Sequence, residues 1–336
     1  VYKRQLWMYH HWRLRTRCLL RTLGIAATFD QACRRRWRVR ADATHRRTRL
    51  LMTTDDDQVL RAITDDNTFR VIVASTTHTI RGVLDAQGVR GQTARYLAEL
   101  VTGAVLVRET MSPHHRLQCV LTGDEGRGRL VADTHPDGST RGLAHLPPDW
   151  KEFRLGNGSM LQVMRTMANG SIYRGLVDAA EQRDVSGALM AYLQESEQTV
   201  SVIGSGMCQH GDEIEIGGGY VVQLLPEASR DALQTMTLRL ERLTDTESLL
   251  RRSGGNARRT LEELLEGTAF CQLDDRPVRF HCGCNQEAVV STLSTLERSE
   301  LEEIIREQEV LELTCDYCRT AYRVGRGQLQ GLLEPS

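Results

Sequence analysis

The sequence lacks three features that would place it in a large functional class. Its 336 residues contain no run of about 18 uninterrupted apolar residues, so no membrane-spanning helix is predicted. The apolar stretch CLLRTLGIAATF is interrupted by Arg21, whereas a secretory signal peptide needs an unbroken apolar segment. The glycine clusters GDEGRGRL and GGGY lack the Gly-Lys-Ser/Thr ending of a phosphate-binding loop, and we expect both to be turns.

A recognisable catalytic set is also missing. His, Ser and Asp residues are scattered along the chain, and no spacing joins a nucleophile, a base and an orienting residue. The nine cysteines, with no secretion signal before them, favour a reducing compartment. In such a compartment, clustered cysteines more often serve metal or redox chemistry than structural disulfides. Because no catalytic set can be recognised, the sequence indicates no class of enzyme, and the cysteines point to metal or redox chemistry.

The charges of the sequence are balanced in total but unevenly distributed. Residues 1–51 contain 14 Lys or Arg and 2 Asp, which leaves 29 basic and 42 acidic residues in 52–336. The first stretch shows little periodicity, and MTTDDDQVL after it reads like a natural start at Met52. We therefore expect residues 1–51 to be a non-native or disordered basic extension outside the fold. An organellar targeting segment and a basic arm that contacts nucleic acid remain the alternatives.

Residues 52–226 are predicted to form an α+β core domain. Alternating apolar residues in FRVIVASTTHTI, HRLQCVLTG, GRLVADTH, SMLQVMRTM and YVVQLLPEA predict strands. GQTARYLAELVTGAVLVRETM and DVSGALMAYLQESEQ carry apolar residues at helical spacing and predict helices. The strands are grouped with the helices instead of alternating with them one by one, which is typical of the α+β class.

Residues 227–281 differ in composition and are predicted to be a helical linker. Of these 55 residues, 19 are Asp, Glu, Lys or Arg, and a Gly-Gly pair interrupts the helical pattern. Two interpretations stay open: a solvated helical connector packed on the core, or a segment close to its folding threshold. The apolar residues keep a heptad-like spacing at Leu233, Met236, Leu240, Leu243 and Leu250.

Two pairs of cysteines lie near the C-terminus. Cys282 and Cys284 form a Cys-x-Cys pair, and after 30 intervening residues Cys315 and Cys318 form a Cys-x-x-Cys pair. Four thiolates in two close pairs are the ligand set of a closed tetrahedral zinc site. We therefore expect one zinc ion per chain, held by these four residues.

The residues between the two pairs are predicted to fold back and bring the pairs together. Ser299 and Glu302 match a capping box that opens a helix, and VLELTC reads as a strand that leads to the second pair. The 37 residues 282–318 are too few for a self-sufficient hydrophobic core. Metal binding should therefore supply folding free energy on the order of 10 kcal/mol to a small domain over residues 282–332.

Other interpretations of the cysteines are weaker. Buried, unreactive thiols rarely occur as two close pairs with polar neighbours. A thioredoxin-type oxidoreductase has its Cys-x-x-Cys motif at a helix start, whereas Cys315 follows a predicted strand. A static structural zinc site stays open. His281 is not expected to bind the metal, and the isolated Cys119, Cys208 and Cys271 are expected to be ordinary thiols.

The same ligand set suits a redox switch. Zinc holds its sulfur ligands deprotonated, and the thiolate is the form that oxidants attack. A disulfide between Cys282 and Cys284 closes a small, strained ring, which makes the bond readily reducible. Oxidation at this site is therefore expected to be reversible.

Several segments match one known family in order. Near the C-terminus these are the Cys-x-Cys pair and CDYC, and in the core they are YLAELVTGAVLV, LTGDEGRGRL, LGNGSMLQV, YRGLVDA, YLQESEQ and GGGYVVQLLP. Together they resemble the heat-shock protein 33 family of redox-regulated bacterial chaperones. The resemblance covers residues 52–332 and no part of 1–51. NQEA and EQEVLEL depart from the family pattern beside the two cysteine pairs, but all four ligands are present.

The resemblance implies a cytoplasmic holdase, which binds unfolding client proteins and prevents their aggregation without ATP or enzymatic turnover. The reduced, zinc-bound form would be inactive and monomeric. Oxidation by peroxide with heat, or by hypochlorite, would pair Cys282 with Cys284 and Cys315 with Cys318, release zinc, unfold the linker and favour a homodimer. The alternative is a static four-cysteine zinc ribbon with a basic arm on nucleic acid, which the acidic composition of 52–336 disfavours.

Overall fold

The structure is a computed structural model that describes residues 56–182, 184–226, 228–243 and 245–333. Residues 1–51, which are predicted to lie outside the fold, are not among the described residues. Among the described residues, no helix is long and apolar enough to cross a membrane.

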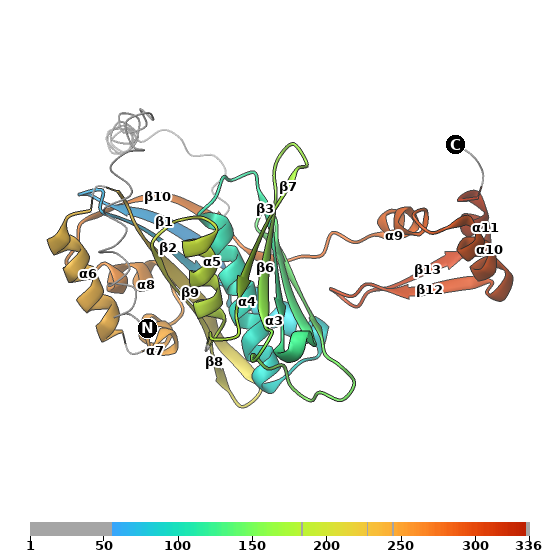
Figure 1. Cartoon of the computed structure of the whole chain (residues 1–336), viewed down its shortest axis with the longest axis horizontal. Coiled ribbons are helices and arrows are strands. Elements are labelled where there is room, and N and C mark those ends of the chain that lie inside the picture. The colour runs from blue at the N-terminus through green and yellow to red at the C-terminus, as the bar shows by residue number, and fades with distance from the viewer. Residues whose placement is uncertain (1–55, 183, 227, 244, 334–336) are drawn as a thin grey trace. The chain divides into compact units, whose positions relative to one another are not determined.

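Two sheets form the framework of the described core (Figure 1). The first is antiparallel with strand order β10-β1-β2-β9-β8, and the second has the order β11-β5-β4-β3-β6-β7, in which only β11 pairs in parallel. The first sheet contains β1 (Gln58–Thr64), β2 (Phe69–Ser75), β8 (Ser201–His210), β9 (Glu213–Leu224) and β10 (Phe270–Pro277). The second contains β3 (Arg116–Thr122), β4 (Arg129–Thr134), β5 (Ser139–His145), β6 (Met160–Thr166), β7 (Ile172–Asp178) and β11 (Arg279–Phe280).

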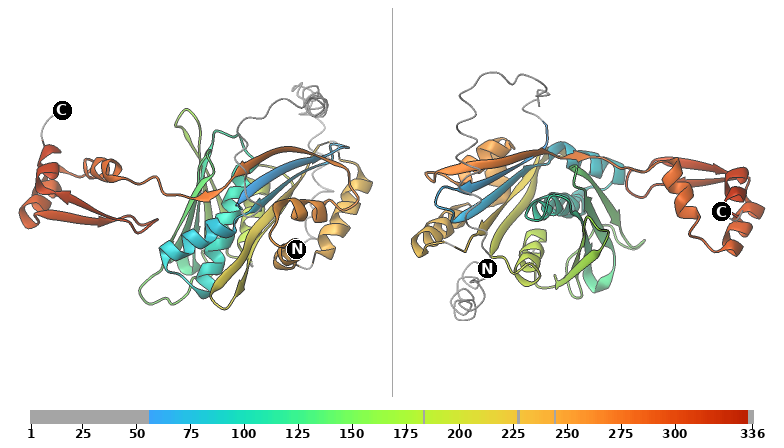
Figure 2. Two further views of the ribbon diagram at one scale, coloured as in Figure 1. Left: turned by 180° about the vertical axis from the view of Figure 1, so that it is seen from behind. Right: turned by 90° about the horizontal axis from the view of Figure 1, so that it is seen from above.

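Three helices, α3 (Thr77–Gln87), α4 (Gly91–Glu109) and α5 (Val185–Glu195), pack between the two sheets (Figure 2). The predicted helices over α4 and α5 are therefore confirmed. Helix α4 contacts strands of both sheets, so it is buried on nearly every side instead of along one stripe. Apolar side chains of α4 and of the facing strands make up the main core.

Two local predictions are wrong in this region. FRVIVASTTHTI is not one long strand, because β2 ends at Ser75 and α3 begins two residues later. The carboxylate of Asp57 accepts hydrogen bonds from the backbone N–H groups of His78 (3.1 Å) and Thr79 (2.6 Å), which stabilises this helix start. The cluster GGGY is not a turn but lies inside β9, where a Cβ on Gly219 would be 2.4 Å from the backbone oxygen of Gly204.

The segment predicted as a helical linker contains three helices and then two strands. Helices α6 (Arg230–Arg242), α7 (Thr246–Ser253) and α8 (Ala257–Leu264) cover the face of the first sheet that points away from α4. Of the predicted apolar stripe, Met236, Leu240 and Leu250 are buried. The helical prediction is wrong for β10, which pairs with β1 along its length because β1 otherwise has an unpaired edge.

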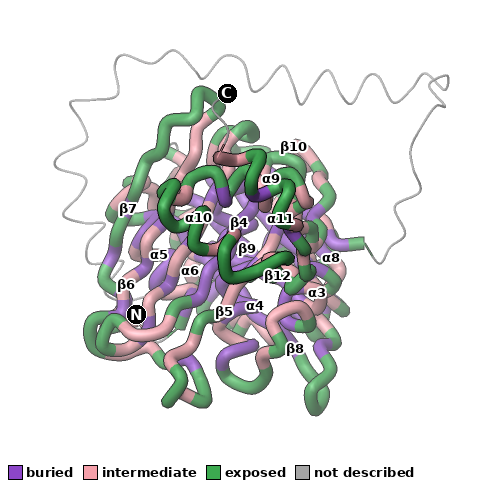
Figure 3. Tube along the Cα trace, turned by 90° about the vertical axis from the view of Figure 1, so that its right-hand side faces the viewer, coloured by how far each residue is buried: buried purple, intermediate pink, exposed green. Residues whose placement is uncertain are grey.

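The C-terminal region forms a small unit with its own core. It contains α9 (Gln286–Leu293), α10 (Arg298–Glu307), β12 (Val310–Thr314), β13 (Ala321–Gly325) and α11 (Arg326–Gly331). The predicted strand β12 is confirmed, but the capping box of α10 consists of Glu297 and Glu300, two residues before the predicted pair. Figure 3 shows that buried residues concentrate in the sheets and α4, whereas α9 to α11 are largely exposed.

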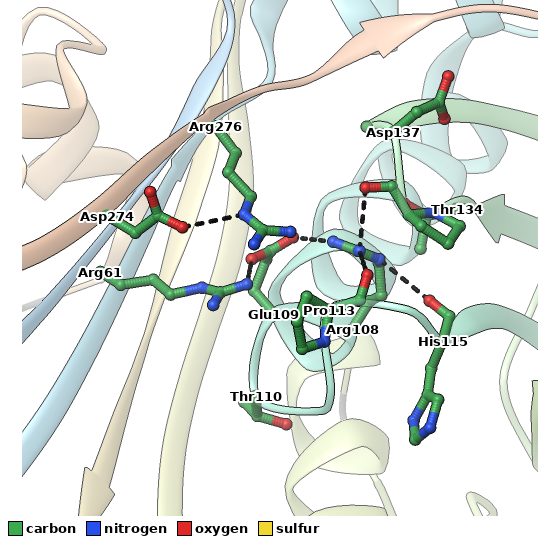
Figure 4. A network of polar contacts seen from close by, with 12 residues as sticks. Arg61, Arg108, Glu109, Thr110, Pro113, His115, Thr134, Asp137, Asp274 and Arg276 are labelled. Atoms are coloured by element: carbon green, nitrogen blue, oxygen red, sulfur yellow. Dashed lines mark hydrogen bonds and ion pairs between the residues drawn. The ribbon is translucent and has the colours of Figure 1, made fainter. Parts of the chain in front are cut away.

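A buried ion-pair network lies at the C-terminal end of α4 (Figure 4). The Glu109 carboxylate is 4% exposed and accepts hydrogen bonds from Arg61 of β1 and from Arg108. The Arg108 guanidinium, 2% exposed, also donates to the backbone oxygens of Pro113 (2.7 Å) and Pro136 (3.2 Å). These contacts join the first sheet, α4 and the loops of the second sheet through charged groups that have little access to water.

Candidate metal centre

The four predicted ligand residues come from two loops that the local structure brings together. Cys282 and Cys284 lie between β11 and α9, and Cys315 and Cys318 lie in the loop between β12 and β13. The β12–β13 ladder pairs its ends next to that loop. The backbone N–H of Cys315 donates to Thr320 (2.9 Å), which closes the loop into a tight turn.

The four sulfurs form one compact group. All four Sγ atoms lie within 4.8 Å of one another, and each residue is half-buried. The Sγ atoms of Cys282 and Cys315 are 3.8 Å apart, and those of Cys284 and Cys318 are 3.2 Å apart. A tetrahedral ion with Zn–S bonds of about 2.3 Å needs sulfurs about 3.8 Å apart. The cluster therefore fits a four-coordinate metal with little movement.

The hydrogen bonds of the cluster affect its cysteines unequally. Burial raises the pKa of Cys284 to about 12, although the Tyr322 hydroxyl donates to its Sγ at 3.0 Å. Burial also raises the pKa of Cys315. Burial opposes ionisation of Cys318 too, but hydrogen bonds with Thr320, one of them at 3.2 Å to its hydroxyl, lower the pKa of Cys318 to about 6. Metal binding must therefore displace protons from some of these sulfurs and not from others.

The core contributes contacts to the cluster that the sequence did not predict. The Arg141 guanidinium of β5 donates to Cys282 Sγ at 3.4 Å and lies 4.1 Å from the centre of the Tyr317 ring. The same guanidinium bonds the buried carboxylate of Asp133 on β4 at 3.0 Å. Arg141 and Cys282 are 141 positions apart, so no local spacing could have revealed their contact.

The remaining sequence-predicted cysteines lie outside the cluster. Cys119 on β3 and Cys208 on β8 are buried free thiols, and burial raises the pKa of both, that of Cys119 to about 12. Cys271 on β10 is half-buried and is not a free thiol, so the prediction of an ordinary thiol is wrong there. His281 is exposed and is not part of the group that could hold a metal.

Comparisons with known proteins agree with one another. A family model described as Hsp33 protein matches residues 57–325. A 33 kDa chaperonin of Syntrophotalea carbinolica is 28% identical over 287 residues, covering 82% of this chain and 99% of the relative. A 33 kDa chaperonin of Streptococcus pneumoniae is 24% identical over 288 residues, covering 82% of this chain and 98% of the relative.

The fold also matches a solved structure. The crystal structure of the 33 kDa chaperonin from Thermotoga maritima superposes with a TM-score of 0.71 at 20% sequence identity. The match covers 83% of this chain and 98% of that one. The predicted α+β fold is thereby confirmed.

Proposed function

The chain belongs to the Hsp33 family of chaperones, and on that premise we propose that it is a redox-regulated holdase. The holdase binds unfolding proteins and prevents their aggregation without catalytic turnover. It is inactive while its cysteines are reduced and hold zinc, and it becomes active when they are oxidised. The observation that carries this proposal is the compact group of four sulfurs, which follows in the chain a helical segment that covers an apolar sheet face.

Residues Cys282, Cys284, Cys315 and Cys318 are proposed to hold one zinc ion per chain. Four thiolates at tetrahedral spacing suit zinc better than oxygen-preferring cations. When bound, zinc supplies the positive charge that keeps four thiolates together. The small core of this unit has only four buried apolar side chains, so its folding depends on the metal site. These four side chains are Leu293, Leu301, Val324 and Leu329.

Oxidation is proposed to pair Cys282 with Cys284 and Cys315 with Cys318, as in the family that the sequence resembles. Each pair of zinc-bound thiolates forms one S–S bond and loses two electrons. One molecule of hydrogen peroxide accepts these two electrons, takes up two protons from the solvent and becomes two molecules of water. A sulfur in a disulfide is no longer a thiolate ligand, so the zinc ion leaves.

The domain boundaries follow from this mechanism. We assign residues 52–226 to the core, 227–281 to the linker and 282–332 to the zinc-binding unit. Helices α6 to α8 carry their apolar residues toward the first sheet and charged residues toward water. If the linker unfolds, both the apolar residues of the helices and the sheet face beneath them become available to client proteins.

The proposal extends to assembly and location. We expect a monomer when reduced and a homodimer when oxidised, because the newly exposed apolar surface can also be covered by a second copy. We expect the protein in the cytoplasm, since reduced thiols persist in a reducing compartment.

The deciding experiment measures aggregation of a heat-unfolded client by light scattering, with reduced zinc-bound protein and with peroxide-oxidised protein. Zinc release is followed in the same samples with a chromogenic chelator. We expect suppression of aggregation only after zinc is released. Equal suppression by both forms would contradict the switch, and no suppression by either would favour the static zinc ribbon.

A further inference from the structure

We propose that Arg141 is the residue through which the core holds the zinc-binding unit, residues 282–332, and that this hold depends on the negative charge of the four sulfurs. The inference deepens the proposed function, on which it rests, by naming how the core responds to the state of the centre. Arg141 is a positioning residue in this role and not a metal ligand.

Arg141 is placed to contact both sides at once. Its guanidinium bonds Asp133 Oδ2 at 3.0 Å on the core side. On the other side it donates to Cys282 Sγ at 3.4 Å and stacks 4.1 Å from the ring centre of Tyr317, which lies between Cys315 and Cys318. The planar guanidinium can make hydrogen bonds in its plane and stack on an aromatic face together, which a lysine ammonium cannot.

The charges around Arg141 do not balance within the core. The Asp133 carboxylate is 0% exposed and accepts two 2.7 Å hydrogen bonds from Arg116 as well as those from Arg141. His135 Nε2 lies 3.5 Å from the same carboxylate. One negative charge therefore faces two guanidinium groups, and a positive charge is left over. This excess positive charge lies next to the sulfur cluster, where Arg141 donates to Cys282 Sγ.

The sulfur cluster supplies the missing negative charge only when its cysteines are reduced and bind zinc. Four thiolates around a divalent zinc ion carry a net charge of two negative units. A disulfide carries none, so oxidation of Cys282 removes the anionic partner of Arg141. Because Arg141 is only 20% exposed, its attraction to the cluster is weakly screened by salt compared with a surface ion pair.

Hydrogen bonds between uncharged groups orient the turn that contains Asp316 and Tyr317 against the core. Gln87 at the end of α3 donates to the backbone oxygens of Asp316 (2.8 Å) and Tyr317 (2.9 Å), and its own side-chain oxygen accepts from Ala144 N–H (3.1 Å). Gln118 donates to the Tyr317 hydroxyl at 3.3 Å. Each such bond replaces a bond to water and adds little net free energy, so charge decides whether the turn stays docked.

The docking platform is built into the second sheet. Gln118, Asp133 and Arg141 are direct cross-strand partners on β3, β4 and β5. Side chains at paired positions point to the same face of a sheet. The row therefore keeps its arrangement whether or not the zinc-binding unit is bound, and the core changes its affinity for the unit without changing its own fold.

The test uses the full-length, reduced, zinc-bound protein and measures rotational correlation times by nitrogen-15 relaxation. In the parent protein, backbone amides of residues 282–332 should tumble together with those of the core. In Arg141→Gln we expect loss of this common tumbling, with one zinc ion per chain retained. Common tumbling that persists in zinc-loaded Arg141→Gln would overturn the proposal.

Two further variants separate the charge from general damage to the fold. Arg141→Lys keeps the charge but not the stacking, so its docking should persist at low salt and be lost at high salt. Docking of Arg141→Lys that is absent at every salt concentration would also overturn a role for charge. Arg127→Gln, which removes an exposed arginine paired with Asp149, should leave common tumbling unchanged.

The charge dependence is tested with the oxidised parent protein, in which common tumbling should also be lost. Oxidised protein that keeps it would contradict the release step. A failure of the proposed function would look different: the variants would behave as described in the zinc-bound state, but oxidation would produce no chaperone activity.

Discussion

Glu109 and Arg61 form an ion pair between α4 and β1 of the first sheet, where the carboxylate is 4% exposed and the guanidinium is 17% exposed. Arg108 contacts the same carboxylate. Groups this far from water cannot exchange a lost partner for a solvent molecule. The stability of the core should therefore be sensitive to the loss of the negative charge of this carboxylate.

We expect Glu109→Gln to lower the free energy of unfolding of the core by about 3–5 kcal/mol, because two guanidinium groups lose their anionic partner. Urea unfolding followed by circular dichroism measures this change. Asp149→Asn breaks the exposed ion pair with Arg127 and should leave the unfolding midpoint unchanged. Equal midpoints for Glu109→Gln and the parent protein would contradict the role of the network.

Glu99 should make the stability of the core depend on pH. Burial raises the pKa of Glu99 to about 8, and the nearby carboxylates of Asp184 and Glu247 add to this effect, whereas Arg95 opposes it. An acid whose pKa is higher in the folded state favours folding in its neutral form. Its contribution is therefore fully present below the unfolded pKa of 4.5 and is lost as the pH rises through about 8.

Glu99→Gln keeps the neutral form at every pH, so its stability relative to the parent should rise between pH 5 and pH 8, by ~2–4 kcal/mol. Urea midpoints measured across this range test the expectation. Glu213→Gln, at an exposed position, should track the parent protein throughout. A stability difference that does not grow with pH would show that Glu99 is not a buried neutral acid.

Local patterns predicted the parts of the fold that local patterns control. Helices α4 and α5 have apolar residues at helical spacing. Strands β3 and β6 alternate in burial, whereas β4 and β9 are buried along most of their length. Strand β10 was missed because its residues show no such alternation in burial, and its conformation comes from the free edge of β1, far away in the chain.

The candidate site also has one part that local sequence patterns predicted and one part that they did not. The four cysteines could be found because metal ligands recur at short spacings, and the structure brings all four together. Asp133 and Arg141 could not be found, because a carboxylate and a guanidinium on two strands look like ordinary solvated residues in the sequence. Their proximity to Cys282 depends on the pairing of β4 with β5 and on β11 beside it.

Gly219 should tolerate no side chain. An added Cβ would lie 2.4 Å from the oxygen of Gly204 on the neighbouring strand and 3.0 Å from a methyl group of Leu106. We expect Gly219→Ala to lower the free energy of unfolding of the core by about 1–3 kcal/mol, because the paired strands must separate. Gly327→Ala meets no atom within 4 Å and should leave the core transition in place. Equal transitions in thermal unfolding would contradict close packing of β8 on β9.

The number of protons that zinc binding releases should depend on which of the cysteines are present. The pKa values of Cys284 and Cys315 are raised in the metal-free cluster, so both sulfurs carry protons at pH 7 that the metal must displace. The pKa of Cys318 is lowered to about 6, so this sulfur is mostly ionised before the metal arrives. Each displaced proton makes the apparent zinc affinity rise about tenfold per pH unit.

Calorimetric titration of reduced protein with zinc, in two buffers of different ionisation enthalpy, counts the released protons. Cys284→Ser and Cys318→Ser should both weaken zinc binding, since each removes one ligand. Only Cys284→Ser should also lower the proton count at pH 7, because only its thiol arrives protonated. The same proton count in both variants would contradict the difference between the two sulfurs, which comes from burial at Cys284 and from the hydrogen bonds with Thr320 at Cys318.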